Sequence, residues 1–241
     1  MKNSRLAALA VALSATFTAP TLAANLLAID YNYTGDSSPT QTGFSPFALG
    51  LTNGFDVTNT YGSLTVETEA DAGPLSGAFD RGTFVSPLPD LYRDYAFNND
   101  GGLTTTISGL ISGQSYGLTL YSFDNSTSDT ATITTTFTPI SGTLGSAATV
   151  VFTDGATPTT PLQYAATTVW VANGSGEIVF SVLGSGTGVS SSPIPTRTNG
   201  FELTVATPEP SSLVLAAVGA VGCVALAHRR RRRFSAMWGV V

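Results

Sequence analysis

The chain between residues 25 and 205 is divided into short runs of β-branched and aromatic residues, separated by clusters of glycine, proline, asparagine and aspartate. Serine and threonine make up about a quarter of the sequence, and this region lacks the apolar spacing of a helix. The pattern predicts nine strands, at residues 26–31, 64–68, 103–108, 116–123, 130–137, 148–152, 165–171, 177–183 and 200–205. Short strands without alternating helices favour an all-β fold, an antiparallel two-sheet sandwich of the jelly-roll kind.

The clearest local unit in this region runs from residue 103 to residue 123. Gly109 and Gly113 separate its two expected strands, and glycine tolerates the positive φ angles that tight connections use. The unit is therefore predicted to be a β-hairpin.

The charge of the expected domain is strongly negative. Residues 24–207 contain 15 acidic side chains and three basic ones, which gives a net charge of −12; the other basic residues lie near the two ends of the chain. Such a surface repels nucleic acid and anionic polymers, so we exclude nucleic acid as a partner.

Cysteine and histidine are confined to the C-terminal tail, as Cys223 and His228. The domain therefore cannot form a disulfide, a Cys/His metal site or a Ser-His-Asp triad. No cofactor is expected, apart from calcium as considered below.

The N-terminus has the features of a secretory signal peptide. Lys2 and Arg5 precede an apolar stretch at residues 6–17, and small residues up to Ala23 follow it. We expect signal peptidase to remove residues 1–23, with cleavage after Ala24 as the alternative. The remainder is then exported across the inner membrane.

The C-terminal tail has three parts in a fixed order. Pro208, Glu209 and Pro210 come first, and an apolar segment at residues 211–227 follows. As a helix this segment would be about 25 Å long, just enough to cross a bilayer. The last part is the arginine cluster Arg229, Arg230, Arg231, Arg232 and Arg233. Because arginines resist translocation, the cluster and the tail at 234–241 are predicted to stay cytoplasmic.

This three-part tail, at residues 206–233, resembles the PEP-CTERM sorting signal of Gram-negative bacteria, also called the ice-binding protein C-terminal domain. The resemblance implies that an exosortase recognises the Pro208-Glu209-Pro210 region, cuts nearby and passes the product to the cell surface or the exterior. The inner-membrane anchor would then be transient. An ordinary, permanent membrane anchor is the alternative.

The domain at residues 24–205 resembles jelly rolls of the galactose-binding and malectin-like type. The segments that carry this resemblance are 28–31, 38–39, 43–44, 91–95, 103–123 and 199–203. Such domains often bind carbohydrate on bacterial surface proteins, so the resemblance implies an extracellular polysaccharide as a partner.

Residues 92–95 form the densest group of side chains suited to a sugar. Tyr92 and Tyr95 could stack on a pyranose ring while Arg93 and Asp94 bond its hydroxyl groups. Trp170 is an alternative platform, although its apolar neighbours favour core packing.

Oxygen-rich loops flank the expected hairpin. Asn98, Asp100, Asp124 and Asp129 supply the amide and carboxylate oxygens that calcium prefers, and jelly rolls commonly hold a structural calcium. The alternative is that these residues simply form turns.

Taken together, the sequence predicts an exported, exosortase-processed protein with a non-catalytic β-sandwich that binds glycan. One alternative is a structural envelope or biofilm component without a specific ligand. Another is a glycosidase that uses two carboxylates from the group Glu67, Glu69 and Asp71, although a solvated acidic strand edge explains these residues equally well.

Overall fold

The computed structural model describes residues 25–34, 39–50, 54–76, 88–124, 131–153, 156–187 and 194–206. The predicted signal peptide at 1–23 and the tail from residue 207 onward lie outside these ranges. Within the described ranges there is no helix with the length and apolar character needed to cross a membrane. Regular structure in these ranges is made of strands.

Two large sheets and one small sheet contain all the named strands. Sheet A has the order β10-β7-β13-β1-β2, sheet B the order β3-β4-β6-β11-β8-β9, and the small sheet pairs β12 with β5. The strands are β1 (Asn25–Tyr33), β2 (Ser45–Leu49), β3 (Asp56–Tyr61), β4 (Leu64–Ala70), β5 (Ala96–Asn98), β6 (Leu103–Ser108), β7 (Ser115–Tyr121), β8 (Thr132–Ile140), β9 (Ala148–Thr153), β10 (Ala165–Val171), β11 (Glu177–Thr187), β12 (Thr196–Thr198) and β13 (Gly200–Val205).

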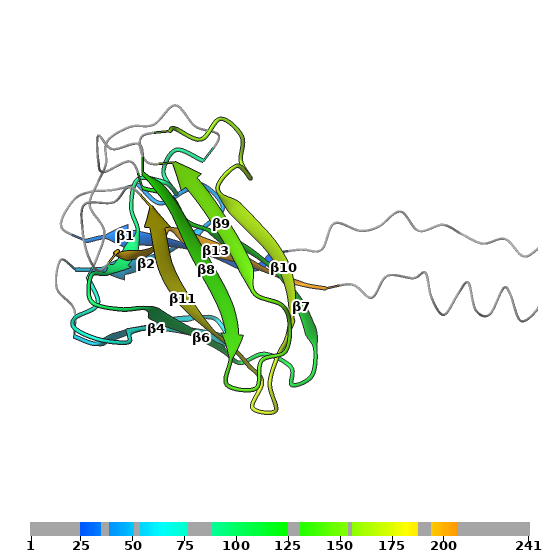
Figure 1. Cartoon of the computed structure of the whole chain (residues 1–241). Coiled ribbons are helices and arrows are strands. Elements are labelled where there is room, and N and C mark those ends of the chain that lie inside the picture. Colours follow the sequence, from blue (N-terminus) through cyan, green and yellow to red (C-terminus); the bar gives the residue numbers. More distant parts are fainter. Residues whose placement is uncertain are drawn as a thin grey trace, which may run out of the picture.

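The two large sheets pack face to face (Figure 1), which confirms the predicted all-β sandwich. Among the strands that the structure describes, the pairs are antiparallel with one exception, because β2 runs parallel to β1. The chain crosses repeatedly from one sheet to the other, as at β6 to β7, β7 to β8 and β9 to β10. Such crossing is typical of jelly rolls.

The hairpin predicted for residues 103–123 is wrong. β6 pairs with β4 and β11 in sheet B, whereas β7 pairs with β10 and β13 in sheet A. Gly109 and Gly113 do have positive φ angles, of 88° and 73°. The tight turn was therefore recognised correctly, but it connects two sheets instead of two neighbours within one sheet.

Apolar side chains from the facing sides of the sheets fill the core. Trp170, Phe137, Phe152, Phe180 and Phe201 are among its largest fully buried members. Trp170 thus packs in the core, and its indole N–H donates a hydrogen bond to the carbonyl of Ser146 at 2.8 Å. A buried tryptophan with a satisfied N–H needs no ligand to explain it.

The sandwich has two chemically different ends. The turns at residues 62–63, 109–114, 141–147 and 172–176 all lie at one end. Both Asn25 and Ala206 are also there, because Thr204 pairs with Asn25 and the Ala206 N–H bonds to Ser115. We call this the terminal end, and the opposite end, which holds the longer connections, the loop end.

Candidate functional site

The predicted sugar-binding residues lie in a segment at the loop end, residues 88–95. Tyr92 is fully buried there, and its ring packs edge-on against Tyr121 and Phe123, with centroids 6.2 and 5.6 Å away. Its hydroxyl reaches the carbonyl of Pro161 at 3.4 Å. Tyr92 is a packing residue.

Tyr95 is also buried, with 3% of its surface exposed. Its ring packs edge-on against Phe97, and the Arg197 guanidinium lies 5.9 Å from the ring centroid. Neither tyrosine presents a ring face that a sugar could cover. The aromatic platform expected from the sequence is therefore corrected to a buried cluster.

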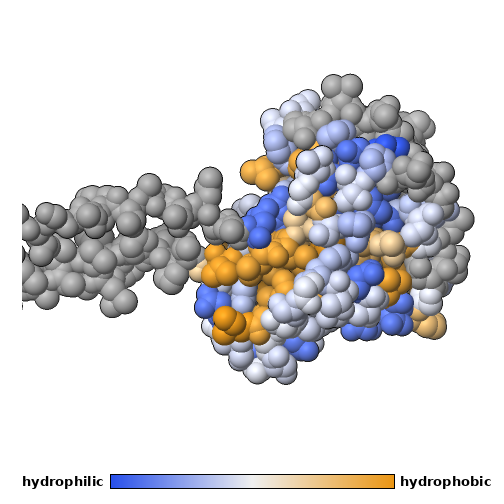
Figure 2. Space-filling view, turned by 180° about the vertical axis from the view of Figure 1, so that it is seen from behind, coloured by the Kyte–Doolittle hydropathy of each residue, from blue (hydrophilic) through white to orange (hydrophobic). Residues whose placement is uncertain are grey.

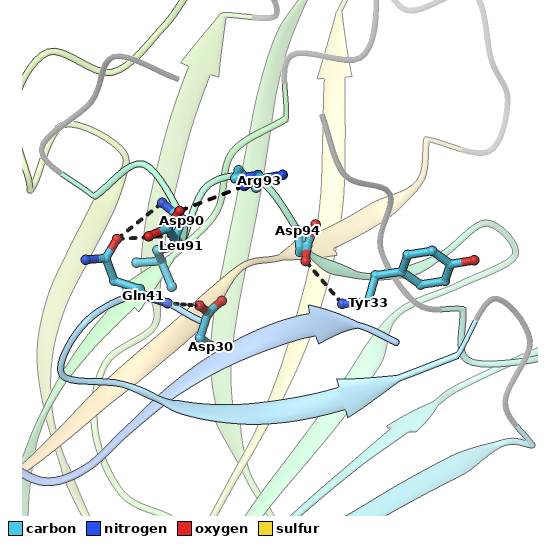
Figure 3. A network of polar contacts seen from close by, with 7 residues as sticks. All are labelled: Asp30, Tyr33, Gln41, Asp90, Leu91, Arg93 and Asp94. Carbon is cyan, nitrogen blue, oxygen red and sulfur yellow. Dashed lines mark hydrogen bonds and ion pairs between the residues drawn. The ribbon is translucent and has the colours of Figure 1, made fainter. Parts of the chain in front are cut away.

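The two charged members of the predicted group have separate partners. Arg93 lies 4.0 Å from the carboxylate of Asp90, three residues earlier in the chain. Asp94 is fully buried, and its Oδ2 accepts a hydrogen bond from the Tyr33 N–H at 3.2 Å. Asp94 thus joins the segment to the end of β1 (Figure 3).

Beneath this segment lies a buried carboxylate that the sequence analysis did not select, that of Asp30 on β1. Its Oδ2 accepts a hydrogen bond from the Gln41 N–H at 2.7 Å, while its Oδ1 has no hydrogen-bond partner among the described residues. The Gln41 side-chain oxygen accepts from the N–H groups of Asp90 and Leu91, at 3.3 and 3.4 Å. Gln41 therefore connects the buried carboxylate to the segment above it (Figure 3).

The environment of Asp30 favours its protonated form. Burial is the main cause that raises the pKa of this carboxyl to about 7, and the negative charges of Asp94 and Asp90 add to it. The hydrogen bond from the backbone N–H of Gln41 acts in the opposite direction. The loop end therefore contains an acid that titrates near neutral pH.

Asn199 holds this region to the sandwich. Its side-chain N–H donates to the carbonyl of Asp94 at 2.7 Å, and its side-chain oxygen accepts from the N–H of Phe123. The next residue, Gly200, leaves room for Leu91, whose Cδ1 would lie 2.9 Å from a Cβ at that position. The sequence does contain one signal that could have identified this region: Asp30 is an acidic residue within a strand that is otherwise largely apolar.

Two described members of the predicted calcium group, Asn98 and Asp124, have partners for their side chains. Asn98 donates to the carbonyl of Gly102 and accepts from the N–H of Asp100, both at 2.9 Å, which is an Asx-type turn. Asp124 is buried and lies 3.0 Å from the guanidinium of Arg197. Asp129 lies outside the described residues.

These contacts favour the turn interpretation of the oxygen-rich loops. The part of the chain that the structure describes contains no group of three or more His, Cys, Asp or Glu side chains placed to hold a metal. Calcium binding stays a prediction.

Glu67 and Glu69 lie on the outer face of β4, where Glu67 is opposite Thr106 and Glu69 opposite Thr104. Residues two apart on a strand lie about 6.6 Å apart and point the same way. A glycosidase needs carboxylates on opposite sides of the bond. Their arrangement gives this alternative no support.

The outer face of sheet B is rich in hydroxyl groups, and we call it the hydroxyl face. Thr104, Ser181 and Thr138 are neighbours in one row across β6, β11 and β8, and Thr136 and Thr149 are neighbours in another row. These side chains are partly or fully exposed, and they alternate with buried core residues such as Phe137 and Val182. Further members are Thr65, Thr106, Ser108, Thr134, Thr153 and Ser185.

The sorting motif Pro208-Glu209-Pro210 and the cluster Arg229–Arg233 lie outside the described residues. Comparison with known families matches residues 206–232 to the PEP-CTERM protein-sorting motif. The resemblance of the tail is thereby confirmed over this range, whereas the galactose-binding and malectin-like resemblance of the domain is not.

Comparison with solved structures gives a match to the P-domain of Macrobrachium rosenbergii nodavirus. The two share 17% identity with a TM-score of 0.27, and the match covers 59% of this chain and 94% of the viral chain. None of the curated proteins matches the sequence. What identifies the chain is therefore its tail: it carries a PEP-CTERM sorting motif, which implies an exported protein that an exosortase processes for the envelope of a Gram-negative bacterium.

Proposed function

We propose that the processed domain is a non-catalytic surface or matrix protein that contacts extracellular polysaccharide through its hydroxyl face. The observation that carries this proposal is the number of Ser and Thr side chains that point outward from β4, β6, β11, β8 and β9. Two exposed apolar residues, Leu183 and Val151, lie among them on this face. The burial of Tyr92 and Tyr95 moves the candidate contact surface from the loop end to this sheet.

Hydroxyl groups suit sugars because each can both donate and accept a hydrogen bond. A single exchange of water for a sugar hydroxyl gains only about 1 kcal/mol, so useful binding requires many contacts at once. A broad sheet face that lies against a polymer of repeating sugar units provides many such contacts.

The charge of the domain narrows the class of polymer. With a net charge of −12 over residues 24–207, and with Glu67 and Glu69 beside the hydroxyl rows, the domain repels polyanions. The expected partner is a neutral polysaccharide.

A pull-down of the secreted protein on insoluble neutral polysaccharides tests the proposal. We expect the wild type to be retained and the variant Thr138→Glu/Thr149→Glu to be lost, because both positions are exposed on the hydroxyl face. The matched control, Thr167→Glu/Thr204→Glu on sheet A, should be retained like the wild type. Circular dichroism establishes that each variant is folded.

Two results would overturn the polysaccharide proposal. A folded wild type that no neutral polysaccharide retains would favour the structural alternative, a coat or biofilm component without a specific ligand. Equal loss of binding in both double variants would show that the hydroxyl face is not the contact surface. Release of soluble sugars during the assay would point instead to the glycosidase.

We further propose that signal peptidase cleaves after Ala23 and that residues 211–227 anchor the precursor in the inner membrane until the exosortase acts. The order of Pro208-Glu209-Pro210, an apolar segment and arginines supports this route. Mass spectrometry of the secreted protein should show an N-terminus at Ala24 and a C-terminus near Pro210. An intact tail on the secreted form would contradict it.

A further inference from the structure

Four of the eight exposed large apolar side chains among the described residues lie at the terminal end of the sandwich, and the other four, Phe55, Val151, Leu162 and Leu183, lie elsewhere. Ile111 is 71% exposed, Leu144 64%, Val169 55% and Leu26 45%. Ile111 and Leu144 lie in two of the terminal turns, while Leu26 and Val169 lie near the terminal ends of β1 and β10. We call these four residues the apolar rim.

Backbone pairing places members of this rim beside the point where the chain leaves the sandwich. Leu144 and Val171 exchange two hydrogen bonds, at 3.2 and 2.8 Å. Val171 pairs with Ser115, whose carbonyl accepts from the Ala206 N–H at 3.1 Å. A series of neighbouring segments therefore leads from Leu144 to Ala206. Leu144 lies beside the end of β10, which lies beside the start of β7, which in turn contacts Ala206. Figure 2 shows apolar surface gathered toward one end of this side of the molecule.

The terminal end also differs from the loop end in charge. The four terminal turns, at residues 62–63, 109–114, 141–147 and 172–176, contain no charged residue, and Glu177 is the acid that follows the last of them. Most described acids are at the loop end, namely Asp30, Asp56, Glu69, Asp71, Asp90, Asp94, Asp100 and Asp124.

This separation of charge matters for an approach to a membrane. Strands of six to nine residues put the two ends about 20–30 Å apart, whereas charges are screened over about 8 Å at physiological salt. An anionic surface at the terminal end would therefore feel little of the domain's negative charge. The terminal end, where Glu177 is the described acid, can approach lipid headgroups that the more acidic loop end would avoid.

The connection to the tail is short. Four residues, 207–210, separate Ala206 from the apolar segment at 211–227, and four extended residues reach about 14 Å. Once that segment lies in a bilayer, the terminal end is held within this distance of the lipid surface.

We propose that, in the precursor, the terminal end is seated on the membrane, with the side chains of the apolar rim in the headgroup region. The partner is the lipid surface. Seating would hold Pro208-Glu209-Pro210 close to the bilayer and point the acidic loop end outward. The inference depends on the membrane span proposed for residues 211–227 and is independent of polysaccharide binding.

Fluorescence quenching with the full chain in lipid vesicles tests this arrangement. Cys223 is the sole cysteine of the sequence and lies in the apolar segment, so an environment-sensitive dye on it reports insertion of the tail. In a Cys223→Ser background, the dye is moved by Ile111→Cys or Leu144→Cys. The matched control is Phe55→Cys, which replaces a residue that is 65% exposed at the loop end.

We expect headgroup-labelled nitroxide lipids to quench the dye at positions 111 and 144 several-fold more than at position 55. Adding Leu144→Asp to the Ile111→Cys variant should reduce its quenching to the level of position 55. In another outcome, nitroxides on the lipid chains quench a dye on Cys223 while dyes at positions 111 and 144 are quenched no more than a dye at position 55. In that case the domain is tethered to the membrane but not seated on it, and the proposal is wrong. If Cys223 is not quenched, the anchor and the seating both fail, and polysaccharide binding is unaffected. If the fluorescence of the dye at position 111 is reduced equally in vesicles that contain no nitroxide, the cause is contact between protein molecules. This result would also overturn the seating proposal.

Discussion

The backbone N–H of Gln41 donates a hydrogen bond of 2.7 Å to the carboxylate of Asp30, and both residues are buried beneath the segment at 88–95. This bond satisfies one carboxylate oxygen, while the other has no hydrogen-bond partner among the described residues. A carboxylate in this position is costly to ionise, because burial removes its water and supplies one strong donor in return.

The first prediction concerns the pH dependence of stability. The pKa of Asp30 rises from 3.8 to about 7 on folding, so between these values the folded state keeps a proton that the unfolded state has released. Its contribution to stability therefore falls as the pH rises from about 4 to about 7, by about 4 kcal/mol at most. We expect the melting temperature of Asp30→Asn to fall much less between pH 5 and pH 8 than that of the wild type.

Glu69→Gln, which removes an exposed carboxylate, is the control for this titration. It should keep the pH dependence of the wild type. An Asp30→Asn variant that keeps that dependence as well would show that another group is responsible.

The positions of the predicted strands agree well with the structure. Those at 103–108, 165–171 and 200–205 have the bounds of β6, β10 and β13, and the other six overlap a strand. These segments alternate apolar and polar residues because one side faces the core, and this is the pattern that sequence reveals most reliably. Which strands become neighbours was not predictable in the same way, since a glycine turn looks alike within a sheet and between sheets.

Four strands were missed, each for a physical reason. β2 contains Pro46, which lacks a backbone N–H and usually signals the absence of a strand. β3 is a polar edge strand whose residues alternate between exposed and half-buried, so it has no clear apolar face. β5 and β12 have three residues each, too few to show a period.

The predicted sugar site failed for a different reason. The local sequence around Tyr92 resembles an exposed aromatic loop, but Gly200 leaves a gap on the outer face of sheet A that Leu91 fills. The segment is thereby drawn onto the sheet, and its tyrosines are buried with it. A contact between residues more than a hundred positions apart leaves no local trace in the sequence.

That contact leads to the second prediction. A methyl group at position 200 would overlap the carbonyl of Ile29 and press on Leu91, so Gly200→Ala should cost about 2–3 kcal/mol of unfolding free energy. Gly174 has no atom within 4 Å of its Cβ position, so Gly174→Ala should have little effect. Urea denaturation compares the two. Equal stabilities would contradict the packing described here.

The third prediction concerns Asn199, which links three parts of the chain. Asn199→Leu removes the hydrogen bonds that Asn199 makes to the carbonyl of Asp94 and the N–H of Phe123, and each buried loss costs about 1–3 kcal/mol. The contrasting variant is Asn59→Leu, because the side-chain nitrogen of Asn59 is buried without a hydrogen-bond partner among the described residues. Asn59→Leu should be close to neutral, and a larger loss there than at Asn199 would refute this account.

The last prediction separates an ion pair from a calcium site at Asp124. Asp124 and Arg197 are 3.0 Å apart, with side chains 0% and 11% exposed, so Arg197→Gln leaves a buried carboxylate without its cation. Breaking such a pair costs about 3–5 kcal/mol, and Arg197→Gln/Asp124→Asn should recover most of the loss. Melting temperatures of the wild type in calcium and in a chelator complete the test. The ion pair predicts equal values, because Arg197 already neutralises the carboxylate. A rise in calcium that Asp124→Asn abolishes would instead make Asp124 a metal ligand and restore the site expected from the oxygen-rich loops.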